Sequence, residues 1–154
     1  MKPLIDLDRF YEPTGRMEIK VSRRGVLTAA ADAAEERRRS REGLPSYRIE
    51  SLMDLDDGEL SALCPIVNSK AKIDLKGDFV FAETLAAVDP IPLFPVKSPA
   101  LFIFNQFNGG QTIAEIIDKT AAHTGWDAER SSRAVRTVFL KLCEVRVCEP
   151  GNPK

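Results

Sequence analysis

The chain has 154 residues, of which 44% are hydrophobic and 29% charged, and this composition is typical of a soluble globular protein. Its 22 basic and 23 acidic side chains give a formal net charge of -1, so no overall field attracts nucleic acid or an anionic membrane. No apolar run approaches the roughly 20 residues that a membrane-spanning helix needs. The length is enough for one ordinary domain with an appendage.

Residues 1–65 are predicted to be an extension that docks on a partner. Up to about Arg16, prolines and a glycine interrupt scattered apolar residues, which is typical of an arm with little structure of its own. From Ser22 to Arg41, an alanine-rich run predicts a helix that ends in a basic cluster before Gly43. Its less polar face is weakly hydrophobic, so we expect this helix to need another surface for stability.

Residues 22–27 (SRRGVL) resemble the core of a twin-arginine export signal. In such a signal, an uncharged apolar segment follows the arginine pair. Here the following residues include Asp32 and lead directly into the charged run at 35–39. An ordinary helix with a charged end is therefore the preferred interpretation, and export is the alternative.

Metal and disulfide chemistry lack the residues that they need. Cys64, Cys143 and Cys148 are few, odd in number and irregularly spaced, so we expect reduced thiols, buried as small hydrophobes, in a cytoplasmic protein. The sole histidine, His123, lies in a different predicted helix from these cysteines. The acidic residues at 54–57 lack the spacing of a calcium loop and instead predict a helix start for 58–63. We expect no metal and no cofactor.

Residues 66–154 are predicted to begin with a β-hairpin. Residues 71–75 alternate apolar and polar side chains, 76–78 form a turn, and 79–82 resume with aromatic and β-branched residues. A third extended stretch, 88–96, contains Pro90, Pro92 and Pro95. Since proline cannot donate to a central ladder, this stretch is expected to be an edge strand or a polyproline-like connector.

Three helices follow, each with a recognisable start. Ser98 and Pro99 predict the first, which ends near the glycines at 109–110. Thr112 and Glu115 form a capping box for the second. Asp127 is the expected N-cap of the third, whose apolar residues recur at helical spacing, and residues 145–148 are a candidate terminal strand. The fold class predicted is α+β, with a hairpin and an edge strand before three helices.

The order of these elements around residues 104–116 (FNQFNGGQTIAEI) resembles the PqqD-like family. In that family a helix ends in a glycine, and a threonine and a short aliphatic-x-glutamate-isoleucine run follow. Here these residues are Gly110, Thr112, Ile113, Glu115 and Ile116. The resemblance covers about residues 66–150 and implies a winged-helix-like peptide-binding domain at 66–154.

PqqD-like domains are recognition elements for ribosomally made precursor peptides. They hold the leader segment and present it to a modifying enzyme, often a radical SAM protein. The resemblance implies that a peptide adds as a strand beside the third extended stretch and lies against the third helix, where main-chain hydrogen bonds supply affinity. The residues that would line this groove are Ile91, Leu93, Phe94, Arg133, Arg136, Thr137 and Leu140.

Two features depart from the family pattern. The prolines of the third stretch remove donors from the receiving edge; if they point outward, strand addition is weakened or shifted, and if inward, the edge stays usable. The long N-terminal extension is the second departure. It is consistent with a recognition-element fold that has been adapted to hold a partner protein.

Three functions compete on the sequence alone. The preferred one is a non-enzymatic accessory protein that binds a peptide or partner protein, since no nucleophile-base pair or phosphate loop is visible. The first alternative is a small structural subunit of a larger enzyme. The second is a winged-helix DNA-binding protein, which the near-neutral charge and the acidic residues Asp127 and Glu129 disfavour. We expect no nucleic-acid and no membrane partner.

Overall fold

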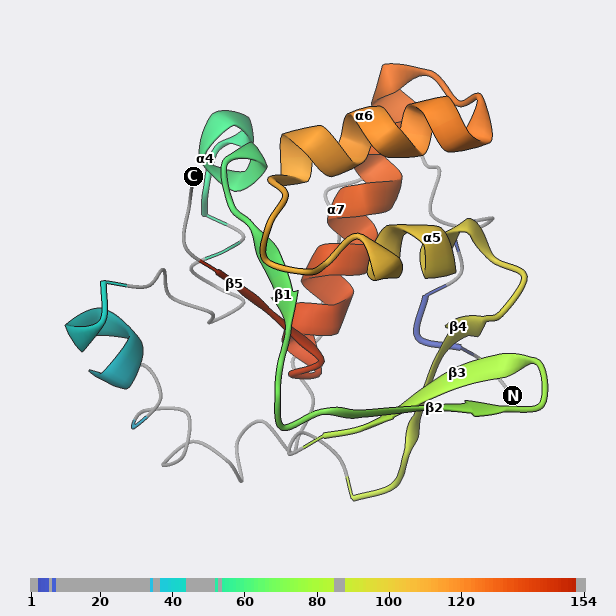
Figure 1. The fold of residues 1–154 in the computed structure, drawn as a ribbon, viewed down its shortest axis with the longest axis horizontal. Coiled ribbons are helices and arrows are strands. Elements are labelled where there is room, and N and C mark those ends of the chain that lie inside the picture. Colours follow the sequence, from blue (N-terminus) through green and yellow to red (C-terminus); the bar gives the residue numbers. More distant parts are fainter. Residues whose placement is uncertain are drawn as a thin grey trace.

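The computed structural model describes residues 3–5, 7, 34, 37–43, 52, 54–84 and 88–151 (Figure 1). Its described part is α+β, with two antiparallel sheets of strand order β1-β5 and β2-β3-β4. The elements in chain order are α4 (Asp57–Ser61), β1 (Pro65–Val67), β2 (Lys72–Lys76), β3 (Phe79–Glu83), β4 (Ile91–Pro95), α5 (Pro99–Asn105), α6 (Ile113–Thr124), α7 (Ala128–Glu144) and β5 (Cys148–Pro150).

The predicted hairpin is confirmed as β2 and β3. Lys76 and Phe79 pair across a two-residue turn, and Gly77 adopts a φ of 61° that favours glycine. The proline-containing stretch forms β4, which pairs antiparallel with β3 at the edge of the sheet. Of the two alternatives for this stretch, the structure therefore contains the edge strand. Leu93 has no partner in β3, because the register shifts between Val80 and Phe81.

The three helix starts are also confirmed. The Ser98 side chain accepts a hydrogen bond from the Ala100 N–H, and Thr112 and Glu115 form the expected capping box. Asp127 accepts from the Arg130 N–H at 2.7 Å at the start of α7. Since each cap satisfies a backbone donor that the helix leaves unpaired, these short polar residues fix where the helices begin.

Helix α7 is the centre of the core, with α5 and α6 in front of it in Figure 1. Aromatic rings connect it to the sheet in edge-to-face contacts. Phe139 of α7 meets Phe107 with 6.0 Å between ring centroids, Phe107 meets Phe104 at 6.4 Å, and Phe104 meets Phe94 of β4 at 5.8 Å. This column ties β4 firmly to the helices.

Described residues from the predicted extension contribute to the same core. Ile5, Leu7, Leu52, Leu60 and Leu63 are buried in one cluster with the side chains of α5, α6 and α7. The predicted boundary after residue 65 passes through β1, a three-residue strand that the sequence analysis did not predict and that pairs with β5. The core therefore has no break at this boundary, and independent folding of 66–154 stays a prediction.

Much of the predicted N-terminal structure lies outside the described residues. The export-like residues 22–27 belong to that part of the chain, as does most of the arm. Of the predicted alanine-rich helix, residues 34 and 37–41 are described and are helical. They include Arg39, a buried arginine whose role is considered in the Discussion.

The three cysteines are fully buried, as expected for thiols that act as small hydrophobes. Burial raises the pKa of the Cys143 thiol far above its ordinary value, and Glu149 adds to this effect while Arg146 and Arg39 oppose it. Burial also raises the pKa of Cys148, with further contributions from Cys143 and Glu149. Both thiols are therefore protonated at neutral pH.

Glu144, the last residue of α7, gives the protein a pH-dependent stability. Burial raises the pKa of this carboxyl from 4.5 to about 7, with Lys141 opposing the shift. The folded state therefore binds a proton more tightly than the unfolded state, and this contribution to stability is lost as pH rises from about 4.5 to about 7. Glu144→Gln should raise the free energy of unfolding at pH 7.5 by about 1 kcal/mol, a value reduced for solvent screening. Urea titrations at pH 4 and 7.5 test this, because the gain should be nearly absent at pH 4, below both pKa values.

Candidate functional site

The outer edge of β4 carries the main candidate site, because an extended segment of the chain is bound to it. The backbone N–H groups of Leu4 and Ile5 donate to the carbonyls of Pro92 and Leu93, both at 2.8 Å. In Figure 1 this N-terminal segment, drawn in blue, lies beside β4. Residues 3–5 and 7, which we call the N-terminal segment, thus extend the sheet beyond its last assigned strand.

The prolines of β4 do not prevent this pairing. A proline lacks an N–H but keeps its carbonyl, and Pro92 uses that carbonyl as an acceptor. The neighbouring carbonyl of Leu93 also faces outward, where the missing β3 partner marks a bulge. The edge of β4 therefore accepts two hydrogen bonds from the N-terminal segment despite its prolines.

Side chains of the N-terminal segment supply the apolar part of the contact. Ile5 is 0% exposed and Leu7 is 3% exposed, and both pack into the core cluster. Residues two apart in an extended chain point to the same side, so this spacing buries one face of the segment. Main-chain hydrogen bonds together with alternate buried side chains are the two components of strand addition.

The predicted groove residues on β4 differ in their placement. Leu93 and Phe94 are both fully buried in the core, and Ile91 is half-buried. Two adjacent buried residues depart from the alternation of a regular strand, and the bulge at Leu93 accounts for this departure. Phe94 points to Phe104 and belongs to the aromatic column described above.

The predicted groove residues on α7 are Arg133, Arg136, Thr137 and Leu140. They lie on one side of the helix, because 136 and 137 are three and four residues from 133, and 140 is four and three residues from them. Thr137 and Leu140 are buried within the core. Arg133 forms an ion pair with Glu129 at 3.0 Å, and Arg136 forms one with Asp57 of α4 at 2.8 Å. Both arginines therefore already have acidic neighbours within the chain, and Arg136 is held toward α4.

Sequence reasoning missed the N-terminal segment as part of the site. Its residues alternate as Ile5, Asp6 and Leu7, the period of a half-buried strand, which was the available signal. Pro3 and the brevity of the run concealed it, because a strand of this length has little statistical weight. The partner strand lies almost ninety residues away in sequence, and no local pattern identifies it.

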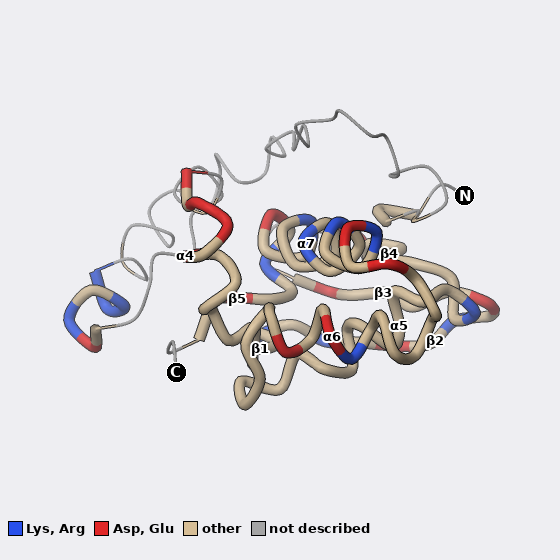
Figure 2. Tube along the Cα trace, turned by 90° about the horizontal axis from the view of Figure 1, so that it is seen from above, with Lys and Arg blue, Asp and Glu red and all other residues tan. Residues whose placement is uncertain are grey.

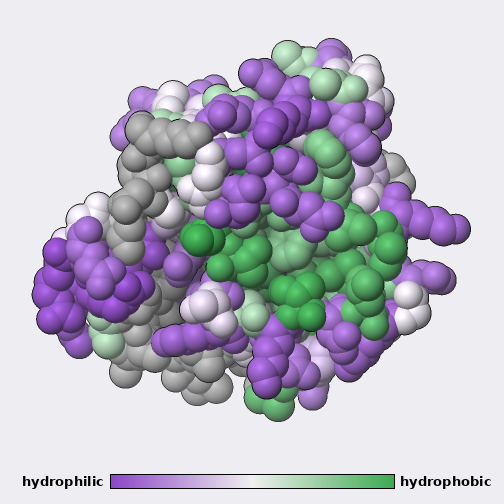
Figure 3. All heavy atoms as spheres, in the orientation of Figure 1, coloured by the Kyte–Doolittle hydropathy of each residue, from purple (hydrophilic) through white to green (hydrophobic). Residues whose placement is uncertain are grey.

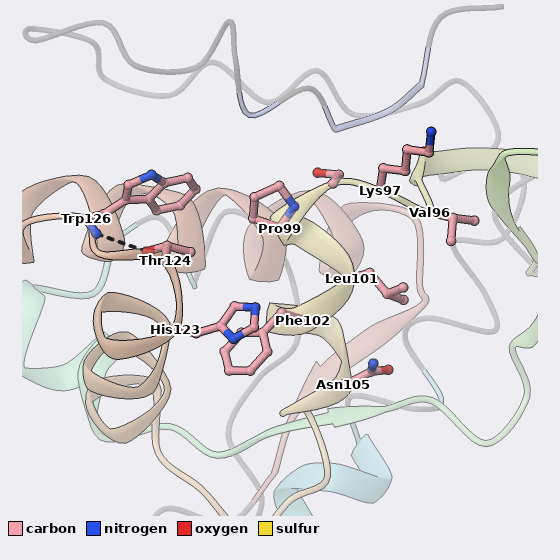
Figure 4. Close-up of a pocket in the computed structure, with 10 residues that line it drawn as sticks. Val96, Lys97, Pro99, Leu101, Phe102, Asn105, His123, Thr124 and Trp126 are labelled. Carbon is pink, nitrogen blue, oxygen red and sulfur yellow. Dashed lines mark hydrogen bonds between the residues drawn. The ribbon is translucent and has the colours of Figure 1, made fainter.

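A second concave surface lies between α5 and the end of α6 (Figure 4). It is an open depression of about 570 Å³ in which His123 stacks on Phe102, with 3.9 Å between ring centroids. The backbone N–H of Trp126 donates to the Thr124 hydroxyl, and the Arg130 guanidinium lies over the Trp126 ring. Its lining residues are Val96, Lys97, Ser98, Pro99, Leu101, Phe102, Asn105, His123, Thr124 and Trp126.

The chemistry available in this depression is limited. Its one imidazole is stacked on a phenyl ring and has no carboxylate or thiol among the lining residues. Across the described residues, no group of three or more His, Cys, Asp and Glu side chains is arranged to hold a metal ion. The β4 edge is therefore the stronger candidate, because it already binds a polypeptide segment.

Comparison with family models, curated proteins and solved structures gave no match to this chain. None of the helices in the described ranges is long and apolar enough to cross a membrane.

Proposed function

We propose that this protein is a non-enzymatic accessory factor that binds an extended peptide, or an extended segment of a partner protein, at the outer edge of β4. In this proposal it has a winged-helix-like fold of the PqqD-like kind and presents the bound segment to a modifying enzyme, such as a radical SAM protein, in the cytoplasm. The carrying observation is the pair of hydrogen bonds by which Pro92 and Leu93 accept from an extended backbone.

The physical support is that this edge meets the requirements of a peptide-binding strand. Its carbonyls face outward, its main chain is rigidified by the aromatic column, and a buried apolar surface lies beside it. A preformed edge reduces the ordering cost of binding, which falls mainly on the peptide. Arg133 and Arg136 would add selectivity by exchanging Glu129 and Asp57 for acidic residues of the peptide.

A DNA-binding function has less support. Figure 2 shows acidic and basic residues interspersed along α6 and α7, without a continuous basic stripe. Asp127 and Glu129 stand at the start of α7, where a recognition helix would approach phosphates.

The small-subunit alternative is favoured by a different surface. Figure 3 shows an apolar area between α5 and the β2–β3 hairpin, where Ile66, Ile73 and Leu75 are exposed.

Fluorescent peptides that cover the short open reading frames beside the gene provide the test. We expect the full chain to bind one of them, and Arg133→Glu with Arg136→Glu to weaken this binding by about 1–3 kcal/mol through the loss of charge-assisted contacts. Fluorescence anisotropy measures the affinity. Arg136 pairs with Asp57, so Arg136→Glu also removes an ion pair within the chain. The thermal midpoint of each variant is therefore recorded in parallel, to separate an effect on stability from an effect on binding.

The matched control is Lys72→Glu with Lys119→Glu, which makes the same charge change at exposed positions of β2 and α6. It should leave peptide affinity within about a factor of two, since exposed distant charges are screened. If both double variants bound the peptide with equal affinity, Arg133 and Arg136 would not belong to the binding site, and the small-subunit function would be favoured. Affinity for duplex DNA that falls steeply with added salt would favour the DNA alternative instead.

A further inference from the structure

The N-terminal segment occupies the same edge that the proposed function assigns to a partner peptide. Its two hydrogen bonds use the outward carbonyls of Pro92 and Leu93, so an incoming strand cannot form them while the segment is bound. Ile5 and Leu7 fill the apolar surface beside this edge. The N-terminal segment and a partner peptide therefore compete for the same two carbonyls and the same apolar surface.

The segment is also separable from the sheet that it extends. The order β2-β3-β4 is hydrogen-bonded through β2–β3 and β3–β4 pairing, to which the described residues 3–5 and 7 contribute nothing. The two donors, Leu4 and Ile5, belong to no strand, whereas their acceptors lie in β4. Removal of the segment from β4 thus leaves the ladders of the three-stranded sheet intact.

We propose that the N-terminal segment, residues 3–5 and 7, is an internal peptide ligand, which covers the β4 edge in the free protein and is displaced when a partner peptide adds there. This inference rests on the proposed function, and it specifies the partner's chemistry. The displacing segment is extended and carries two aliphatic side chains spaced as Ile5 and Leu7 are. A tethered ligand acts at an effective concentration of about millimolar, so only a partner that exceeds this competition is retained.

The full chain with Ile5→Asp and Leu7→Asp tests the displacement, because a carboxylate is strongly disfavoured in an apolar site and frees the edge. The probe is a labelled synthetic peptide with the sequence of residues 2–8, Lys-Pro-Leu-Ile-Asp-Leu-Asp. We expect the variant to bind this peptide at least tenfold more tightly than the unmodified chain, whose edge is occupied. A peptide that carries the same two substitutions should not bind.

Ile73→Asp with Leu75→Asp is the matched control, since it makes the same chemical change at exposed positions on the opposite edge strand. Its affinity for the peptide should equal that of the unmodified chain. If the Ile5 and Leu7 variant retains its folded circular dichroism spectrum and melting transition but does not bind the peptide, the inference is overturned. Gain of binding by both double variants also overturns it.

A covalent lock provides a second measurement that keeps both apolar side chains. Leu4→Cys with Pro92→Cys places thiols on hydrogen-bonded neighbours, and strand spacing of about 4.8 Å lies within the range that a disulfide spans. We expect the oxidised full chain to bind the peptide at least tenfold more weakly than the same chain after reduction. Equal binding of the peptide by the oxidised and reduced forms overturns the inference. This measurement does not depend on whether the Ile5→Asp and Leu7→Asp variant folds.

These results separate the inference from the proposed function. A peptide from a neighbouring reading frame that binds the unmodified chain, while the residue 2–8 peptide binds no form, would support the proposed function and overturn the internal ligand. Binding of the residue 2–8 peptide to the freed edge, with no neighbouring peptide bound by any form, would support the internal ligand and contradict the presentation of a precursor peptide.

Discussion

Phe94→Ala should lower the free energy of unfolding by about 3–5 kcal/mol, the range for large aromatic truncations in a core. Phe94 is fully buried and makes an edge-to-face contact with Phe104, so its loss leaves a cavity between β4 and α5. Urea denaturation followed by circular dichroism measures the change. The midpoint should fall while the slope of the transition stays the same, as expected for a change in stability alone.

Ile91→Ala is the control for this prediction, because Ile91 lies on the same strand but is only half-buried. It should cost about 1–2 kcal/mol, in proportion to the smaller apolar area that it buries. A cost below about 1 kcal/mol for Phe94→Ala, accompanied by weaker peptide binding, would show that the side chain lines the groove as the sequence analysis predicted. The expected result instead assigns it to the support of the edge.

Arg39→Glu should lower the free energy of unfolding by about 3–5 kcal/mol, the range for breaking a buried ion pair. The Arg39 side chain is 1% exposed, donates to the Pro150 carbonyl, and has its guanidinium 3.5 Å from the Glu149 carboxylate. A glutamate at this position would leave the carbonyl without this donor and place two carboxylates together. Thermal and urea unfolding both measure the effect.

The neighbouring arginine supplies the control. Arg38 pairs with Glu42 at the surface, and the side chains are 40% and 53% exposed. Arg38→Glu should therefore change stability by less than about 1 kcal/mol, the usual range for an exposed ion pair. If Arg39→Glu were equally mild, Arg39 would not anchor residues 37–41 to β5, and those residues would contribute little to the fold.

Local signals in the sequence predicted most elements from residue 70 onward. Ser98, Thr112 and Asp127 mark the helix starts because a cap is decided by residues within one turn. Gly77 marks the hairpin because its positive φ is required by a two-residue turn. In each case, the residues that decide the local structure lie within a few positions of one another in the sequence.

The unpredicted features depend on contacts between distant parts of the chain. β1 has three residues and exists because Pro65, Ile66 and Val67 meet β5. Arg39 resembled one of several surface arginines in the sequence, and its contacts with Pro150 and Glu149 of β5 make it a buried anchor. At the candidate site, the bulge that buries both Leu93 and Phe94 and the pairing of Arg136 with Asp57 likewise come from tertiary packing.

The two edges of the three-stranded sheet also differ in how they avoid unwanted association. All residues of β2 are exposed, and its apolar Ile73 and Leu75 alternate with Lys72, Asp74 and Lys76. Charged residues on an edge strand disfavour pairing with another chain, since a neighbouring strand would have to accommodate them. The β4 edge has few charges, and the N-terminal segment covers it. Loss of that segment without a ligand in its place would thus leave an edge open to pairing with a second copy of the chain.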